Sequence, residues 1–139
     1  MYLKNKKWAN NWDIIDTSAE HVLGPIYGQD YKFLKQMSSS KNLWDRRIAV
    51  LSTFYWIRKN QFAEIESVST WLLNDQEDLI HKATGWLLRE VGKKDIEFLR
   101  NFLTKHADKM PRTMLRYSIE KMSKSEQKKW RDIKGSKIT

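Results

Sequence analysis

The chain has 139 residues, a length typical of one domain with a continuous hydrophobic core. Apolar residues make up 40% of it, with seven Trp, five Tyr and five Phe, so the body of the chain is expected to fold. Cys is absent, which excludes disulfides, thiolate metal sites and a Cys nucleophile. No run is apolar enough for a membrane span and the start lacks a signal peptide, so we expect no membrane partner and a cytoplasmic location.

The net charge of +9 lies mainly in the two ends of the chain. Residues 1–7 hold three Lys and no acid, and residues 123–139 hold six basic and two acidic residues. Residues 8–122 therefore carry only +2, which is too little to attract a polyanion strongly. If this body binds DNA, its charges must be sorted onto different surfaces.

Apolar residues recur at three- and four-residue spacings, which predicts helix throughout. The expected helices lie near 11–23, 30–38, 42–58, 61–74, 77–91, 95–107, 111–121 and 124–132. Their expected boundaries are a stop at Gly24-Pro25, turns at Asn60 and Asn74-Asp75, a left-handed C-cap at Gly92 and a helix start at Pro111. The basic tail from Ser123 is expected to be partly frayed.

These helices form pairs over 30–58, 61–91 and 95–121, with a repeat near 33 residues. One pair cannot bury both of its faces, so neighbouring pairs are expected to stack. The sequence thus predicts an all-α chain in which residues 1–139 form a single α-solenoid of HEAT-like helix pairs.

Charges are unevenly distributed along the second pair. No Lys or Arg lies between Asn60 and His81, and the acids there predict an acidic surface; they are Glu64, Glu66, Asp75, Glu77 and Asp78. In the following helix, one polar stripe nearly opposite the apolar face carries Lys82, Trp86, Arg89 and Lys93. The cations fit a solvated face or a nucleic-acid backbone, and Trp86 fits packing on an adjacent repeat or contact with a ligand.

Three further Arg residues are candidates for binding an anion. Arg47 falls inside the apolar sector of helix 42–58, where its charge needs a carboxylate, backbone carbonyls or a phosphate. Arg112 and Arg116 lie one turn apart after Pro111 and either extend a basic strip or have simple surface roles. In helix 11–23, Trp12 and Asp16 also lie one turn apart, at the edge of the apolar face, and the helical pattern alone favours a structural role for them.

Four blocks in this order carry a family resemblance: NNWDIIDTSA, LWDRRIAVLSTFYWIRK, DLIHKATGWLLREVGK and MPRTMLRYSIEKM. They resemble consecutive helices of the AlkD-type DNA alkylation repair glycosylases, which are built from HEAT-like repeats. The resemblance runs from about Trp8 to Met122 and implies removal of cationic alkylated bases, such as 3-methyladenine and 7-methylguanine, from double-stranded DNA. It implies that Asp16 is the catalytic carboxylate, that Trp12 and Trp86 contact the sugar, and that Arg47 and Arg89 contact the DNA backbone.

The implied chemistry needs few groups, because a cationic base leaves without being protonated. One carboxylate near C1′ can stabilise the oxocarbenium-like sugar and orient a water. We expect no metal or other cofactor, since His21, His81 and His106 lack ligand spacing and no phosphate-binding loop is present.

Relatives of this type carry further helical repeats before the W-D-x-x-D helix, which here begins almost at Met1. This departure predicts a truncated form, or one that needs a missing N-terminal half or a partner chain. The sequence leaves two other functions open, a non-catalytic DNA-binding module and a protein-interaction scaffold.

Overall fold

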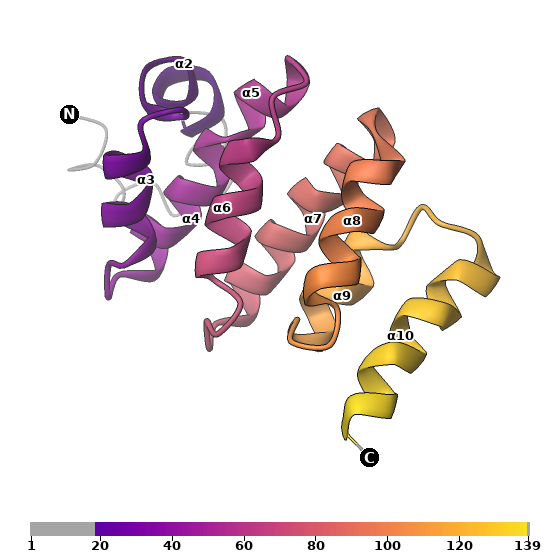
Figure 1. Ribbon diagram of the computed structural model, residues 1–139. Helices are drawn as coiled ribbons and strands as arrows, with labels where there is room; N and C mark the ends of the chain where they lie inside the picture. The colour runs from indigo at the N-terminus through magenta and orange to yellow at the C-terminus, as the bar shows by residue number, and fades with distance from the viewer. Residues whose placement is uncertain (1–18, 139) are drawn as a thin grey trace.

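The computed structural model describes residues 19–138, with side chains as far as Ile133 (Figure 1). This part of the chain is helical and contains no strand, which confirms the all-α prediction. In chain order its elements are a π-helical turn η2 (Ala19–Leu23) and the helices α2 (Gly24–Tyr27), α3 (Tyr31–Ser38), α4 (Leu43–Ser52), α5 (Phe54–Arg58), α6 (Ala63–Trp71), α7 (Asp78–Lys94), α8 (Ile96–His106), α9 (Arg112–Ser118) and α10 (Lys124–Ile138).

The helices stack in two layers, as expected of an α-solenoid. Figure 1 shows α3, α6 and α8 side by side in the nearer layer, with α4, α7 and α9 behind them. The nearer helices begin at Tyr31, Ala63 and Ile96, so the repeat is about 33 residues, as the sequence predicts. The last helix, α10, follows α9 at the end of the stack.

Side-chain caps fix several of the predicted helix starts. The carboxylate of Asp30 accepts a hydrogen bond from the Phe33 amide at 3.1 Å, and the side chain of Asn42 accepts one from the Trp44 amide at 2.8 Å. Asp95 caps α8 in the same way. Each cap satisfies an amide that has no partner inside its helix, so the boundary is encoded locally.

Two predictions about the helices are wrong. The expected helix 42–58 is interrupted at Thr53, whose hydroxyl and amide both donate to the Val50 carbonyl, which tightens the turn before α5. The predicted stop at Gly24-Pro25 coincides with the end of η2 at Leu23, but the chain stays helical, because α2 begins at Gly24. The first turn of α2 accepts Pro25 because a proline needs no amide donor there.

Gly92 is not a left-handed cap, because α7 continues to Lys94 and no described glycine has a positive φ. A Cβ at Gly92 would lie 2.6 Å from Leu99 Cδ2. The glycine therefore serves the close approach of α7 to α8. The predicted turn at Asn60 is confirmed, and its φ is 62°.

The core consists of two clusters that meet along α7. Leu87 and Val91 belong to the first cluster, with residues from η2 to α7, and Leu88 belongs to the second, with residues from α7 to α10. All three are fully buried. Because α7 faces both clusters, it fixes the positions of its neighbours α4 and α9.

The basic tail forms a longer helix than predicted and packs on the stack. Trp130 of α10 is only 3% exposed and lies in the second core cluster. Arg100 of α8 donates two hydrogen bonds to Glu126, both at 2.9 Å. As far as Ile133, the expected fraying is therefore wrong, because this part of α10 has both an apolar anchor and an ion pair.

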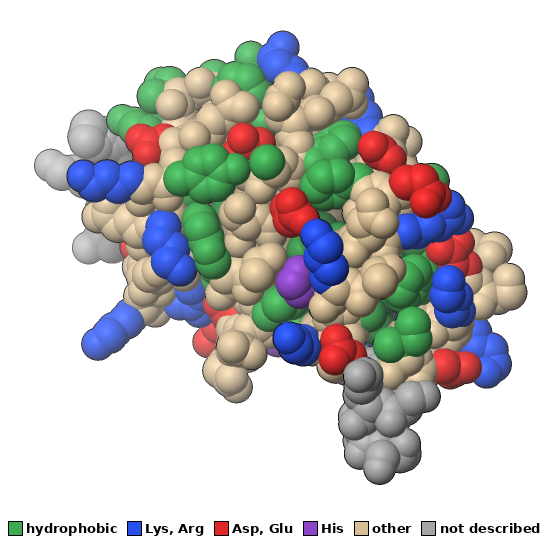
Figure 2. All heavy atoms as spheres, in the orientation of Figure 1, with side chains coloured by type: hydrophobic (Ala, Val, Ile, Leu, Met, Phe, Trp, Pro, Cys, Tyr) green, Lys and Arg blue, Asp and Glu red, His purple; other side chains and the backbone are tan. Residues whose placement is uncertain are grey.

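The predicted acidic surface is also largely wrong. Glu64 is buried, Asp75 is paired with Arg46, and Asp78 is paired with Lys82. Figure 2 shows the nearer face of the stack, where acidic and basic side chains are interspersed. The charges along one segment do not predict its surface here, because the cations that pair with these acids come from other helices or from the next turn.

The Arg100–Glu126 pair predicts how the docking of α10 depends on pH. The hydrogen bonds from Arg100 hold the pKa of the Glu126 carboxyl down, from 4.5 to about 2. An acid whose pKa is depressed by folding stabilises the fold above its unfolded pKa, and this contribution disappears as the pH falls through the folded value. We therefore expect Glu126→Gln to lower the urea midpoint at pH 7 and to lose this effect between about pH 4.5 and 2. A midpoint difference that stays constant over this range would contradict the assignment.

No helix in the described part of the chain combines the length and the apolar character that crossing a bilayer requires.

Candidate nucleic-acid interface

A pocket of about 380 Å³ lies where α4, α7 and α9 meet. Its polar and aromatic walls are Arg47 from α4, Lys82 and Trp86 from α7, and Tyr117 from α9. The apolar side chains of Leu79 and Ala83 complete it. Three of the residues singled out in the sequence thus share one cavity, which we call the main pocket.

Arg47 is half-buried at the wall of this pocket. Its Nη1 donates to the Leu79 carbonyl across the repeat boundary, with a distance of 3.4 Å. A backbone carbonyl is one of the three partners expected for the Arg47 charge, the others being a carboxylate and a phosphate. The bond orients the guanidinium toward α7, so Arg47 and Lys82 place two cations around one cavity.

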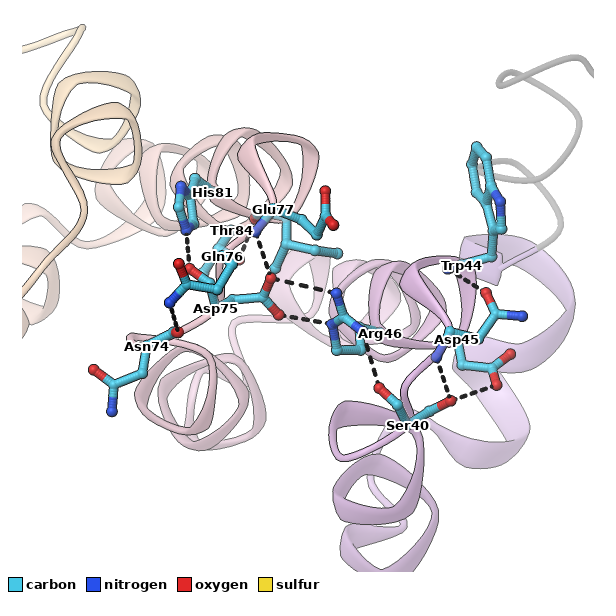
Figure 3. A network of polar contacts seen from close by, with 12 residues as sticks. Ser40, Trp44, Asp45, Arg46, Asn74, Asp75, Gln76, Glu77, His81 and Thr84 are labelled. Carbon is cyan, nitrogen blue, oxygen red and sulfur yellow. Dashed lines mark hydrogen bonds and ion pairs between the residues drawn. The ribbon is translucent and has the colours of Figure 1, made fainter.

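The preceding residue, Arg46, has a different role, which the sequence analysis missed. Figure 3 shows its guanidinium between two elements: Nε donates to the Asp75 carboxylate at 2.7 Å, and Nη1 donates to the Ser40 carbonyl at 2.9 Å. Only 14% of the Arg46 side chain and 5% of the Asp75 side chain are exposed. Arg46 therefore holds neighbouring repeats together, while Arg47 lines the pocket.

Trp86 is half-buried rather than on an open polar face. Its ring meets Phe54 of α5 edge-on, with centroids 5.2 Å apart and an interplanar angle of 86°. The Arg58 guanidinium also lies over the Phe54 ring, 4.3 Å from its centroid, and Arg58 is paired with the buried Glu20. The packing alternative for Trp86 is therefore confirmed, since its ring lies against the preceding repeat. Trp86 also lines the pocket, but its contact with a ligand stays a prediction.

Lys82 lies at the rim of the main pocket and is paired with Asp78 at 3.3 Å. Hydrogen bonds from Thr113 and from Lys82 lower the pKa of the Asp78 carboxyl. Asp78 thus stays ionised and offsets part of the Lys82 charge. Both side chains are well exposed, so solvent screens this pair and a phosphate can compete for Lys82.

Arg89 and Lys93 continue the predicted stripe but do not line the main pocket. They line a second, smaller pocket of about 160 Å³, together with Lys121 and Ser118 near the end of α9. Arg89 is paired with Glu120 at 2.7 Å, and Lys93 with Glu90 at 3.0 Å. The packing of α9 on α7 thus divides one helical stripe between two cavities.

Arg112 and Arg116 are exposed on α9 and line neither of these two pockets. The Arg116 guanidinium lies 6.0 Å from the ring centroid of Tyr117, a wall of the main pocket. Their proposed contact with DNA stays a prediction.

The predicted catalytic pair, Trp12 and Asp16, lies outside the described residues, and its roles also stay predictions. Among residues 19–138, no group of three or more His, Asp or Glu side chains is placed to hold a metal ion. The residues that sequence reasoning missed are Tyr117, Glu120 and Lys121. The sequence gives only a weak signal for them, because the packing of α9 on α7 is what brings Tyr117 and Lys121 to the pockets and Glu120 to Arg89.

The main pocket has the composition of a surface for a nucleic-acid backbone. Cations suit phosphate oxygens, and an aromatic ring suits a sugar or a base. Comparison with protein families finds that the model described as "DNA alkylation repair enzyme" matches residues 1–122. Comparisons with curated proteins and with solved structures returned no match.

Proposed function

The chain belongs to the DNA alkylation repair enzyme family, and on this premise we propose that it is a DNA N-glycosylase. Its proposed substrates are cationic alkylated bases in double-stranded DNA, such as 3-methyladenine and 7-methylguanine. The observation that carries the proposal is the main pocket, in which Arg47, Lys82 and Trp86 converge within the matched residues.

The described residues would hold the backbone of the damaged strand. Trp86 offers a ring, supported by Phe54, against which the deoxyribose can lie. Arg47 and Lys82 flank it and suit the phosphates on either side. Sugar and phosphate contacts of this kind position a nucleotide without reading its base.

Asp16 and Trp12 would supply the chemistry, by the match of their W-D-x-x-D pattern to the family. The bond between C1′ and the base nitrogen breaks, and its electron pair neutralises the departing cationic base. Asp16 stabilises the positive charge that develops on the sugar and accepts a proton from the water that attacks C1′. The π faces of Trp12 and Trp86 would also stabilise the positive charge that develops on the sugar.

Four further residues complete the proposed DNA-binding set. Arg89, Lys93, Arg112 and Arg116 would contact phosphates away from the reacting sugar. Their side chains lie beyond the main pocket, on α7 and α9.

The test is the release of free bases from a methylated duplex by the full chain. We expect 3-methyladenine and 7-methylguanine to be released at least about a hundredfold faster than without protein, because enzymes commonly accelerate reactions by far more than this. An unmethylated duplex should release no normal bases. DNA binding that weakens with salt but gives no release would favour the non-catalytic DNA-binding module. No binding at low salt would favour the protein-interaction scaffold.

A further inference from the structure

The second pocket gathers three cations, and two of these are paired with carboxylates of the protein itself. Arg89 and Lys93 reach it from α7, and Lys121 reaches it from the turn after α9. Gly92, Ser118 and three apolar residues also line it; the apolar ones are Ile96, Leu99 and Met122. We call this cavity of about 160 Å³ the notch.

Arg89 is the most constrained cation of the notch. Its side chain is 19% exposed, with Nη1 on Glu120 at 2.7 Å and Nη2 3.7 Å from Glu90. Its Nε is buried and makes no hydrogen bond. A buried N–H without an acceptor is costly, so the present arrangement leaves the hydrogen-bonding capacity of the Arg89 guanidinium incompletely used.

The two carboxylates that are paired with cations of the notch differ in how firmly they are held. Glu90 is 19% exposed and contacts both Arg89 and Lys93. Glu120 is 53% exposed, and its carboxylate contacts Arg89 alone among the described residues. Glu120 is therefore the acid that an incoming anion can displace at the lower cost, and its departure would leave three cations facing one acid.

We infer that the notch is a second phosphate-binding site for the DNA backbone, formed by Arg89, Lys93 and Lys121. In the absence of DNA, Glu120 forms an ion pair with Arg89, and a phosphate replaces Glu120 when DNA binds. This inference rests on the proposed function for its ligand, DNA, but not on base removal. It adds Lys121 to the DNA-binding residues and gives Glu120 the role of an internal competitor.

The competitor role is tested with Glu120→Gln, using an unmodified duplex and fluorescence anisotropy at low salt. The substitution keeps the shape of the side chain but removes the charge that competes with phosphate. A ligand binds more weakly when only a fraction of the protein has its site available. Removing the Glu120 charge frees Arg89 in a larger fraction, so the affinity for DNA should rise by about three- to tenfold. The hydrogen bond from Gln127 to residue 120 uses the backbone carbonyl, so the turn should be retained.

The matched control is Glu97→Gln on α8, which changes the net charge equally and also removes a Glu–Arg pair. We expect it to change affinity less than about twofold, since long-range effects of exposed charges are screened. In an Arg89→Ala background, Glu120→Gln should give no gain. An equal gain from both glutamates, or a gain that persists without Arg89, would overturn the competitor role.

Lys121→Gln tests the new phosphate contact. Each phosphate contact adds roughly 0.9 to the slope of log affinity against log salt. Lys121→Gln should therefore weaken binding and make this slope shallower by about one, while the exposed Lys105→Gln on α8 leaves the slope unchanged. An unchanged slope for Lys121→Gln would overturn the inference.

Two outcomes separate this inference from the proposed function. If the wild type binds DNA and releases methylated bases but the Glu120 and Lys121 variants behave like their controls, only the notch is wrong. If the wild type does not bind DNA at low salt, both are wrong.

Discussion

Asp16→Asn is expected to lower the rate constant of base release by a factor on the order of 10²–10³, a typical loss when one group that stabilises developing charge is removed. Asparagine has nearly the same shape as aspartate but carries no charge and cannot accept a proton from water. The loss should appear in single-turnover release from a methylated duplex. Affinity for the intact duplex should stay within about threefold, because the phosphate contacts are assigned to other residues.

Asp13→Asn is the matched control for this experiment. The same chemical change is made three residues earlier, at an acid whose position in the first turn of the expected helix is explained by the helix dipole. We expect base release to stay near the wild-type rate. Release at the wild-type rate by Asp16→Asn, or an equal loss in both variants, would remove Asp16 from its catalytic role.

The helical pattern predicts part of the candidate site correctly. Lys82 and Trp86 are one turn apart on α7, and both line the main pocket with Arg47. The same pattern places Arg89 and Lys93 in one stripe with them, whereas they line the notch. The division comes from α9, which brings Tyr117 to one cavity, and from the turn after it, which brings Lys121 to the other. The periodicity of residues along α7 contains no information about how α9 packs against it.

Local signals predict helix starts better than they predict ion pairs. Asp30, Asn42 and Asp95 cap helices within a few residues of themselves, so their role can be read from nearby sequence. Asp75 pairs with Arg46 across 29 residues, whereas the charge pattern predicts an acidic surface at this position. The sequence does not show which of the two adjacent Arg residues forms a buried ion pair. Tertiary packing decides this, because it places Arg46 beside Asp75 and Arg47 at the pocket.

Asp75→Asn is expected to destabilise the protein by about 3 kcal/mol, measured as the free energy of unfolding in urea. The Arg46 and Asp75 side chains are 14% and 5% exposed, so removing the carboxylate leaves a guanidinium charge with little solvent around it. The carboxylate also accepts from the Glu77 amide at 2.9 Å, in the turn that leads into α7. Since folded domains are typically stable by only about 5–15 kcal/mol, this loss is a large fraction of the total.

Two variants test whether buried charge is the cause. Asp132→Asn removes the acid of an exposed pair with Lys128 and should leave the unfolding midpoint almost unchanged. The double variant Arg46→Met/Asp75→Leu removes both charges, and replacing both members of a buried pair by apolar residues is often nearly neutral. We therefore expect the double variant to be more stable than Asp75→Asn, although it lacks more polar contacts. If it is less stable, the hydrogen bonds to Ser40 and Glu77, rather than the uncompensated Arg46 charge, dominate the contribution of this network.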